Sequence, residues 1–291
     1  MFVYYLILTQ QMKGLKGLFS KKYNLALVTK TFSTDIPSYK ILFDSIQKYN
    51  EDNLPVFVVI PFQDKKLLVD TIGTEGYTLL FDHDIHSFKR PMAGWEQQMI
   101  IKLKTFQHIS AENILLLDSD GRFIRPFYEK DFIAYDDIPY TIVHENKQVA
   151  EYETALKGGD YNNTGYAKAV RAYRDIFGYK SSKIYDYGPN PHLWNTKVLT
   201  DLKSNYLDYN GIELEEFCLT MKSTYGIHFR ETLTYGEYLM ASKTIPIIPS
   251  GPLFKTYHWK EMVEFERGTG LELDENIAKN YLGIIMQNKH T

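Results

Sequence analysis

The chain has 291 residues, of which 44% are hydrophobic and 15% aromatic, so it can bury a large core and gives no sign of disorder. Its 33 basic and 36 acidic residues leave a formal net charge of -3, which provides no overall positive field to hold a nucleic-acid backbone. We therefore expect a globular protein that binds no nucleic acid and meets any anionic ligand with local groups.

Residues 1–23 are predicted to form an amphipathic segment. Its apolar residues recur at helical spacing between lysines. Two interpretations follow: a helix that contacts a membrane surface through residues 12–22, or an element packed on the protein's own core. The apolar start is too short to span a bilayer, and the single cysteine, Cys218, fits a reducing compartment. We expect a cytoplasmic protein, peripheral at the membrane under the first interpretation.

Short β-rich runs alternate with helical patterns from Asn24 to Phe127. The predicted strands are 25–29, 55–60, 77–82 and 114–117, and the predicted helices are 37–49, 65–72 and 95–109. Such alternation predicts an α/β fold whose mostly parallel sheet carries helices on both faces. Ligands of open sheets bind beyond the carboxyl ends of the strands. Those ends carry Thr29, Lys30, Thr31, Asp82 and the run Asp118-Ser119-Asp120.

The second half of the chain is less regular. Helices are predicted at 165–177, 196–206, 212–221 and 231–241, a strand at 245–248, and a closing helix that begins near Asp274 and ends near residue 288. No linker divides the chain. We expect one domain over 24–270, with a nucleotide-binding half (24–127) and an acceptor-side half (128–270), followed by a C-terminal helix within 271–291.

Asp118 and Asp120 follow the apolar run Ile114–Leu117. If the extended geometry continues, side chains spaced i, i+2 point to the same side. Two carboxylates on one side can bind Mn²⁺ or Mg²⁺ together with the oxygens of a diphosphate. Such a metal would neutralise charge on a departing nucleoside diphosphate.

The same residues permit a second enzyme class. Asp118-Ser119-Asp120-Gly121 resembles the Asp-x-Asp-Gly-Thr pattern of haloacid-dehalogenase-like phosphatases, in which the first aspartate is the nucleophile. That family opens its core with the motif strand and has Thr or Val where Arg122 stands here. Its further acidic pair also lies farther away than Asp136-Asp137. The three strand-helix units that precede Asp118 favour a transferase over a phosphatase.

Three blocks carry a family resemblance: the run 94–103, Asp118-Ser119-Asp120, and the run 123–127. They resemble predicted GT-A glycosyltransferases of surface-polysaccharide pathways. Weaker similarity continues in 191–194, 231–239 and His258-Trp259, so the resemblance covers about Asn24 to Trp259. It implies a GT-A fold, a nucleoside-diphosphate sugar as donor, and transfer to a hydroxyl of a glycan or glycoconjugate. A non-catalytic carbohydrate-binding protein on the same fold remains the third possibility.

The resemblance also nominates His258 as the residue that completes a metal site with Asp118 and Asp120, and neutral imidazole is a reasonable ligand for Mn²⁺. Gln98 and Lys102 lie four residues apart and share a helix face that can reach the nucleotide. Arg90 offers a fork to a diphosphate, and Asp82 is placed for nucleoside recognition. Each of these side chains could equally be a solvated or capping group.

An inverting transferase needs a carboxylate that deprotonates the acceptor hydroxyl, whereas a retaining enzyme needs no such base. Glu231 and Glu237 point in opposite directions on one predicted helix, so one is expected to be the base and the other solvated. Glu231 is preferred because it shares its helix face with Tyr235 and Tyr238. The segment with Asn190, His192 and Trp194 is predicted to be a loop that faces the acceptor.

Overall fold

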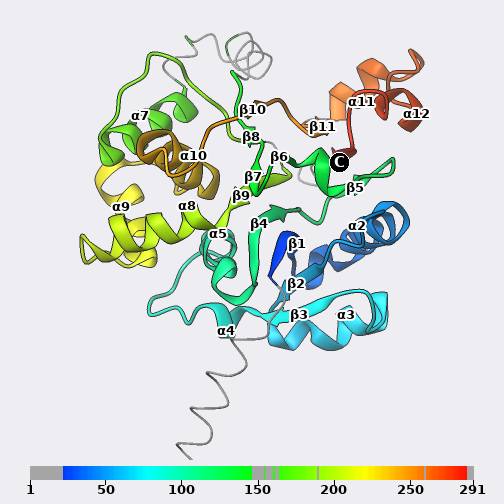
Figure 1. Cartoon of the computed structure of the whole chain (residues 1–291), viewed down its shortest axis with the longest axis horizontal. Helices are drawn as coiled ribbons and strands as arrows, with labels where there is room; N and C mark the ends of the chain where they lie inside the picture. Colours follow the sequence, from blue (N-terminus) through cyan, green and yellow to red (C-terminus); the bar gives the residue numbers. More distant parts are fainter. Residues whose placement is uncertain are drawn as a thin grey trace, which may run out of the picture.

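A five-stranded sheet forms the centre of the protein (Figure 1). The computed structural model describes residues 22–145, 154, 160, 164–188, 190–258 and 260–286. The strands are β1 (Tyr23–Lys30), β2 (Val56–Ile60), β3 (Thr78–Phe81), β4 (Ala111–Leu116) and β9 (His192–Asn195), in the order β3-β2-β1-β4-β9. The first four strands are parallel and β9 is antiparallel to β4. The predicted class, a mostly parallel sheet flanked by helices, is confirmed.

The alternating elements predicted for the first half are all present. The helices between these strands are α2 (Ile36–Tyr49), α3 (Lys65–Ile72), α4 (Asp82–Ile85) and α5 (Gly94–Lys104). The helix predicted for 95–109 ends at Lys104 and continues as a 3-10 helix over Thr105–His108. Pro37 stands in the first turn of α2, where its missing N–H costs no helical hydrogen bond.

The two faces of the sheet are buried in separate cores. On β1, Leu25 and Leu27 pack with the apolar side of α2, while Ala26 and Val28 pack on the opposite core. The second core includes side chains from α5 and from four second-half helices: α7 (Gly165–Phe177), α8 (Thr196–Asp201), α9 (Leu214–Tyr225) and α10 (Glu231–Ser242). Burial on both faces explains why the parallel strands read as continuous apolar runs.

The predicted second-half helices are present, with one irregularity. After α8 the chain continues as a π-helix over Leu202–Asp208. The strand predicted for 245–248 is wrong, since Pro246 has no N–H to donate to a ladder. Pairing starts four residues later than predicted, where β10 (Pro249–Ser250) lies beside β8 (Thr141–Ile142). The single cysteine, Cys218, is free and buried.

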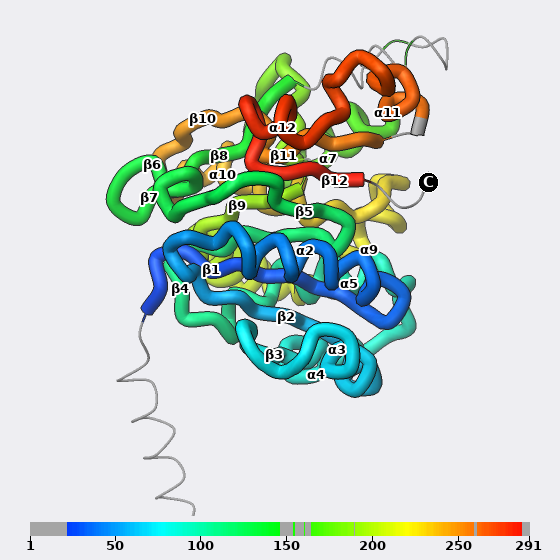
Figure 2. Tube along the Cα trace, turned by 90° about the vertical axis from the view of Figure 1, so that its right-hand side faces the viewer, coloured from blue at the N-terminus to red at the C-terminus, as the bar shows by residue number. Residues whose placement is uncertain are grey.

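A second, three-stranded sheet lies beside the central one. It contains β5 (Gly121–Phe123), β11 (Phe254–Tyr257) and β12 (Gly283–Met286), in the order β11-β12-β5. Short strands β6 (Ile133–Tyr135) and β7 (Ile138–Pro139) form a hairpin nearby. Figure 2 places α11 (Lys260–Glu266) and α12 (Asp274–Ile277) at one end of the molecule and α3 at the other.

The predicted C-terminal helix is wrong in extent. Helix α12 covers only Asp274–Ile277, and the chain then forms β12, which pairs with β5. Ile284 and Ile285 are buried on opposite sides of this strand, so long-range pairing overrides the local helical pattern. Asp274 is the first helical residue, not a side-chain cap, and its carboxylate accepts two hydrogen bonds from the Arg122 guanidinium at 2.5 and 2.7 Å.

Most of the predicted amphipathic segment, residues 1–21, lies outside the described residues, and so does most of the membrane-contact stretch 12–22. The described residue Lys22 forms an ion pair with Glu112. None of the helices in the described residues combines the length and the apolar character that a membrane span requires.

Candidate active site

Polar side chains gather where β1 and β4 end. Because β1 lies between β2 and β4, the chain leaves β1 and β4 beside the point where the strand order reverses. Open α/β sheets bind their ligands at such a point. The segment Asp118-Ser119-Asp120 follows β4 there, as the sequence predicted.

Lys102 joins two acidic side chains from distant parts of the chain. Its ammonium lies 2.7 Å from Asp118 Oδ1 and 3.2 Å from Glu231 Oε1, in the first turn of α10. Burial would lower the pKa of Lys102, but the two carboxylates outweigh it and raise the pKa. Burial would likewise raise the pKa of Asp118, but Lys102 and then His192 lower it. Lys102 is therefore a fixed cation beside an ionised Asp118.

Asp120 has one carboxylate oxygen, Oδ1, that is buried and has no hydrogen-bond partner among the described residues. Burial and the neighbouring Asp118 raise the pKa of Asp120 to about 6. The Asp120 carbonyl accepts a hydrogen bond from the Met286 amide at 3.2 Å, which attaches this turn to β12. A buried, unpaired carboxylate oxygen next to a second carboxylate is suited to a cation.

Proteins usually bind Mg²⁺ through one or two carboxylates, while phosphate oxygens of the substrate and waters complete its coordination shell. Asp118 and Asp120 together provide that number of carboxylates. The third expected ligand, His258, follows β11, which neighbours β12. Among the described residues, however, no group of three His, Cys, Asp or Glu side chains is arranged to hold a metal. Asp118 and Asp120 supply oxygen ligands of the kind that a divalent ion takes, and the assignment of His258 as a third ligand stays a prediction.

Ser119 and Thr31 bind each other: the Ser119 hydroxyl donates to Thr31 Oγ1 at 2.9 Å, and both residues are buried. Thr29 is also buried within β1. The sequence nominated all three for the nucleotide. The Ser119–Thr31 hydrogen bond joins the loops that follow β4 and β1, and the nucleotide-binding role of these residues stays a prediction.

A second charged group lies at the ends of β1, β2 and β3. The Lys30 ammonium donates to the Thr31 carbonyl at 2.8 Å and lies 3.2 Å from Asp82 Oδ2. Burial lowers the pKa of Lys30 and raises that of Asp82, whose Oδ1 is buried without a hydrogen-bond partner. Asp64, after β2, also acts electrostatically on this pair and accepts a hydrogen bond from the Ser33 amide at 2.9 Å.

An aromatic cluster beside Asp82 was missed by sequence reasoning. The rings of Phe62, Phe81 and His83 lie 5.2 to 5.9 Å from one another, and Phe62 is 59% exposed. Exposed rings of this kind can stack on a planar ligand. In the sequence, the only indication of this cluster was the aromatic residues Phe62, after β2, and Phe81, at the end of β3. The parallel pairing of β2 with β3 brings their rings together.

The segment 190–194 was predicted to be a loop. In the structure, His192 and Trp194 belong to β9, and Asn190 lies two residues before that strand. Asn190 Oδ1 accepts a hydrogen bond from the Asp118 amide at 2.8 Å. Asn190 Nδ2 and His192 Nδ1 are buried without partners among the described residues. His192 stacks on Trp194, which stacks on Tyr235. Burial lowers the pKa of His192.

Two other predicted site residues lie on α5 or in the loop before it. Arg90 is exposed in the loop between α4 and α5, and Gln98 is half-buried on α5. The expectation that either Glu231 or Glu237 is solvated is wrong. Glu237 is fully buried and accepts hydrogen bonds from Arg174 at 3.0 and 3.3 Å. It is part of a buried ion pair between α7 and α10, away from Asp118.

A family model, described as "Family of unknown function (DUF6492)", matches residues 22–276. No curated protein sequence matches the chain.

Several solved glycosyltransferases are similar in structure. The apo structure of the bifunctional glycosyltransferase WbbM has a TM-score of 0.52 at 12% identity, and the match covers 94% of this chain and 47% of that one. Apo mouse xyloside xylosyltransferase 1 has a TM-score of 0.47 at 8% identity, with 93% and 99% covered. Galactosyltransferase LgtC, bound to donor and acceptor sugar analogues, has a TM-score of 0.43 at 10% identity, with 90% and 87% covered. The likeness to WbbM supports a glycosyltransferase fold.

Proposed function

The chain belongs to the family of unknown function DUF6492, and we propose that it is a glycosyltransferase that moves a sugar from a nucleoside-diphosphate sugar to a hydroxyl of a glycan or glycoconjugate. The observation that carries the proposal is the acidic turn after β4, where Asp118 is held by Lys102 and Asp120 keeps a buried, unpaired oxygen. A surface-polysaccharide pathway is the proposed setting, at the cytoplasmic side of a membrane.

We assign the diphosphate to the end of β4. Asp118 and Asp120 would hold Mn²⁺ or Mg²⁺, which supplies positive charge for the leaving diphosphate when bound. The Lys102 ammonium adds a fixed cation close by, while Asn190 Nδ2 and His192 are polar groups available to the donor. Preorganised charges of this kind stabilise the transition state without reorganising during the reaction.

The nucleoside is assigned to the ends of β1, β2 and β3. Asp82 Oδ1 is an unpaired acceptor among the described residues. His83 follows Asp82 in the sequence, and the Phe62 ring contacts the His83 ring. Such a site would select the base through hydrogen bonds and stack it on an aromatic surface. Lys30, paired with Asp82, would orient that carboxylate.

Glu231 is the proposed base of an inverting transfer. The oxygen of the acceptor hydroxyl would form a bond to the anomeric carbon as the bond from that carbon to the diphosphate oxygen breaks, and the hydroxyl proton would pass to Glu231. Lys102 contacts Glu231 Oε1 at 3.2 Å and so fixes its orientation. Among the described residues, the second Glu231 oxygen accepts no hydrogen bond, which leaves it to the acceptor.

The test is hydrolysis of nucleotide sugars, a slow side reaction of such enzymes. Purified protein is incubated with UDP-, GDP- and dTDP-sugars in the presence of Mn²⁺ or Mg²⁺, and the released nucleoside diphosphate is measured. We expect turnover of one donor class, and a loss of at least about 100-fold in Asp120→Asn, as when a group that stabilises transition-state charge is removed. Asp44→Asn, on the solvent side of α2, is the matched control and should keep full activity.

Equal turnover in Asp120→Asn and the wild type would refute the metal assignment. Vanadate-sensitive phosphatase activity without turnover of any nucleotide sugar would favour the phosphatase alternative instead. Far-ultraviolet circular dichroism of each variant separates loss of chemistry from loss of folding.

A further inference from the structure

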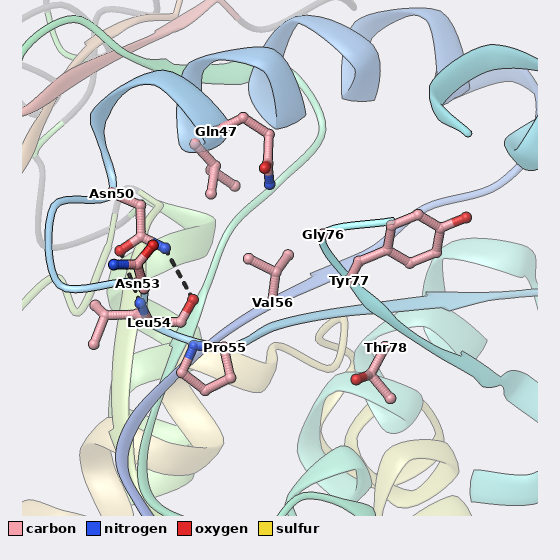
Figure 3. Close-up of a pocket in the computed structure, with 10 residues that line it drawn as sticks. Gln47, Asn50, Asn53, Leu54, Pro55, Val56, Gly76, Tyr77 and Thr78 are labelled. Atoms are coloured by element: carbon pink, nitrogen blue, oxygen red, sulfur yellow. Dashed lines mark hydrogen bonds between the residues drawn. The ribbon is translucent and has the colours of Figure 1, made fainter. Parts of the chain in front are cut away.

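A cavity of about 350 Å³ opens at the N-terminal ends of the sheet strands, whereas Asp118 lies beyond the C-terminal end of β4. The cavity lies where β2 and β3 begin, between the end of α2 and the turn before β3 (Figure 3). Gln47 borders it from α2, Asn53 from the α2–β2 loop, Tyr77 from the turn before β3, and Thr78 from the first position of β3 (Figure 3). Its volume falls within the roughly 300–1,000 Å³ of small-ligand sites.

The lining carries no charge. All ten lining residues are uncharged, although 24% of the chain is charged. A phosphate site would need lysine, arginine or a row of free amides, and a metal site would need carboxylates. The cavity is therefore suited to a neutral ligand.

Three lining side chains are available for hydrogen bonds. Within the described part of the chain, Gln47, Asn53 and Thr78 have no hydrogen-bond partner for their side chains. By contrast, the Asn50 side chain is held by its own loop: its Nδ2 donates to the Leu54 carbonyl and its Oδ1 accepts from the Leu54 amide, each at 2.9 Å (Figure 3). The two free amides and one hydroxyl supply donors and acceptors together. A ligand that offers many hydroxyl groups can satisfy both.

The side of the cavity next to these three side chains is partly apolar, and its Tyr77 side chain is held in place by two contacts. The Tyr77 hydroxyl donates to the Gly73 carbonyl at 2.7 Å, and its ring meets Phe43 edge-on with centroids 5.7 Å apart. Val56 lines the floor from β2. Sugar rings present apolar C–H faces between their hydroxyl groups, so a tyrosine and an aliphatic floor next to free amides match that surface.

We propose that this cavity is a second carbohydrate site, which binds a neutral sugar unit of a glycan away from the reacting centre. The five residues of β2 separate it from the C-terminal edge, roughly 13 Å at the usual rise of a strand. A glycan held there takes no part in the transfer itself. The inference is independent of the function assigned to Asp118.

The experiment measures sugar binding by saturation-transfer difference NMR. The probes are neutral tetrasaccharides of glucose, N-acetylglucosamine, galactose and mannose, with a sialylated oligosaccharide as the charged comparison. Gln47→Ala, Asn53→Gly and Thr78→Val are combined in one variant and also made singly. Glycine suits position 53 because Asn53 has a φ of 52°. Gln107→Ala, which removes an exposed amide elsewhere, is the matched control.

We expect the wild type to bind at least one neutral tetrasaccharide and the triple variant to lose at least about four-fifths of that signal, as three hydrogen-bonding groups are lost. Gln107→Ala should bind as the wild type does, and the triple variant should keep its nucleotide-sugar hydrolysis. An unchanged signal in the triple variant, preference for the charged probe, or no binding of any neutral probe would each overturn the proposal. Sugar binding without hydrolysis in the wild type would support this site and refute the proposed function.

Discussion

Lys102 is the residue on which the candidate site depends most. Its side chain is only 5% exposed and holds Asp118 and Glu231 together. Removing one partner of a buried ion pair leaves an uncompensated charge. We expect Lys102→Met to lower the free energy of unfolding by about 3 kcal/mol and to reduce donor hydrolysis at least about 100-fold. Chemical denaturation and the hydrolysis assay measure the two effects.

A second substitution identifies the cause. Glu231→Gln in the Lys102→Met background removes one of the stranded charges, so the double variant should be more stable than Lys102→Met alone. Lys66→Met is the control, since the Lys66–Asp70 pair is exposed and such pairs contribute only about 0–1 kcal/mol. If Lys102→Met and Lys66→Met have the same unfolding free energy, Lys102 has no structural role.

His86 predicts a pH dependence of stability. Its Nδ1 lies 2.9 Å from the Lys104 ammonium and its Nε2 lies 3.3 Å from Glu215 Oε2, a pattern that neutral imidazole satisfies as acceptor and donor. Burial, and then Lys104, lower the pKa of His86. The unfolded chain therefore binds the proton more readily. The stability from His86 is present above the ordinary pKa of about 6.5 and is lost as the pH falls below it.

We expect the melting temperature of His86→Gln to fall less between pH 7 and pH 5.5 than that of the wild type, because glutamine can accept and donate but does not titrate in this range. Differential scanning fluorimetry across this interval provides the measurement. His83→Gln, at an exposed histidine, should keep the wild-type slope. Parallel curves for all three proteins would contradict the assignment.

At the scale of elements, the first half of the chain was predictable because local pattern and tertiary environment agree. The apolar runs of β1, β2 and β4 are buried on both faces, and helices with one apolar side separate them. The second half contains strands that no local pattern indicates. β12 has a short apolar run that local signals assign to a helix, and only its pairing with β5 makes it a strand.

The candidate site divides in the same way. Asp118 and Asp120 were predictable because one local feature, an apolar strand that ends in two carboxylates, contains the signal. The contact between Lys102 and Glu231 spans 129 residues and depends on the packing of α5 against α10. The hydrogen bond that Asn190 accepts from the Asp118 amide likewise depends on how β9 joins the sheet.

Gly236 tests how tightly α10 is packed. Helix propensity alone predicts that Gly→Ala in a helix stabilises by about 1 kcal/mol. A Cβ at Gly236, however, would lie 2.2 Å from Cγ of Tyr187. We expect Gly236→Ala to lower the unfolding free energy by about 1–3 kcal/mol through overpacking. Gly165→Ala, at the first residue of α7 with nothing within 4 Å, should be neutral or stabilising. Equal effects of the two substitutions would refute this account.

At the scale of the whole molecule, the site is built from both halves of the chain. β1 and β4 come from the first half, and β9 and α10 come from the second. A ligand that binds only this assembled edge stabilises the complete fold, by about 2.7 kcal/mol at one hundred times its dissociation constant. For a chain of 291 residues, with an unfolding entropy of about 2.1 cal/mol/K per residue, we expect a rise in melting temperature of about 4 °C with the matching nucleoside diphosphate and Mn²⁺.

Variants of Asp118 should distinguish stabilisation by a ligand bound at this site from unspecific stabilisation by nucleotide or metal. In Asp118→Asn the rise should fall to that produced by the nucleotide alone, because a carboxylate that would hold the cation is gone, and it should persist in full in Asp44→Asn. Chelation of the metal should reduce the rise in the wild type to that produced by the nucleotide alone. Because the nucleoside is assigned to Asp82 and the diphosphate to Asp118, Asp82→Asn should weaken the nucleotide effect with and without metal. An equal rise in Asp118→Asn and the wild type would place the nucleotide elsewhere on the molecule.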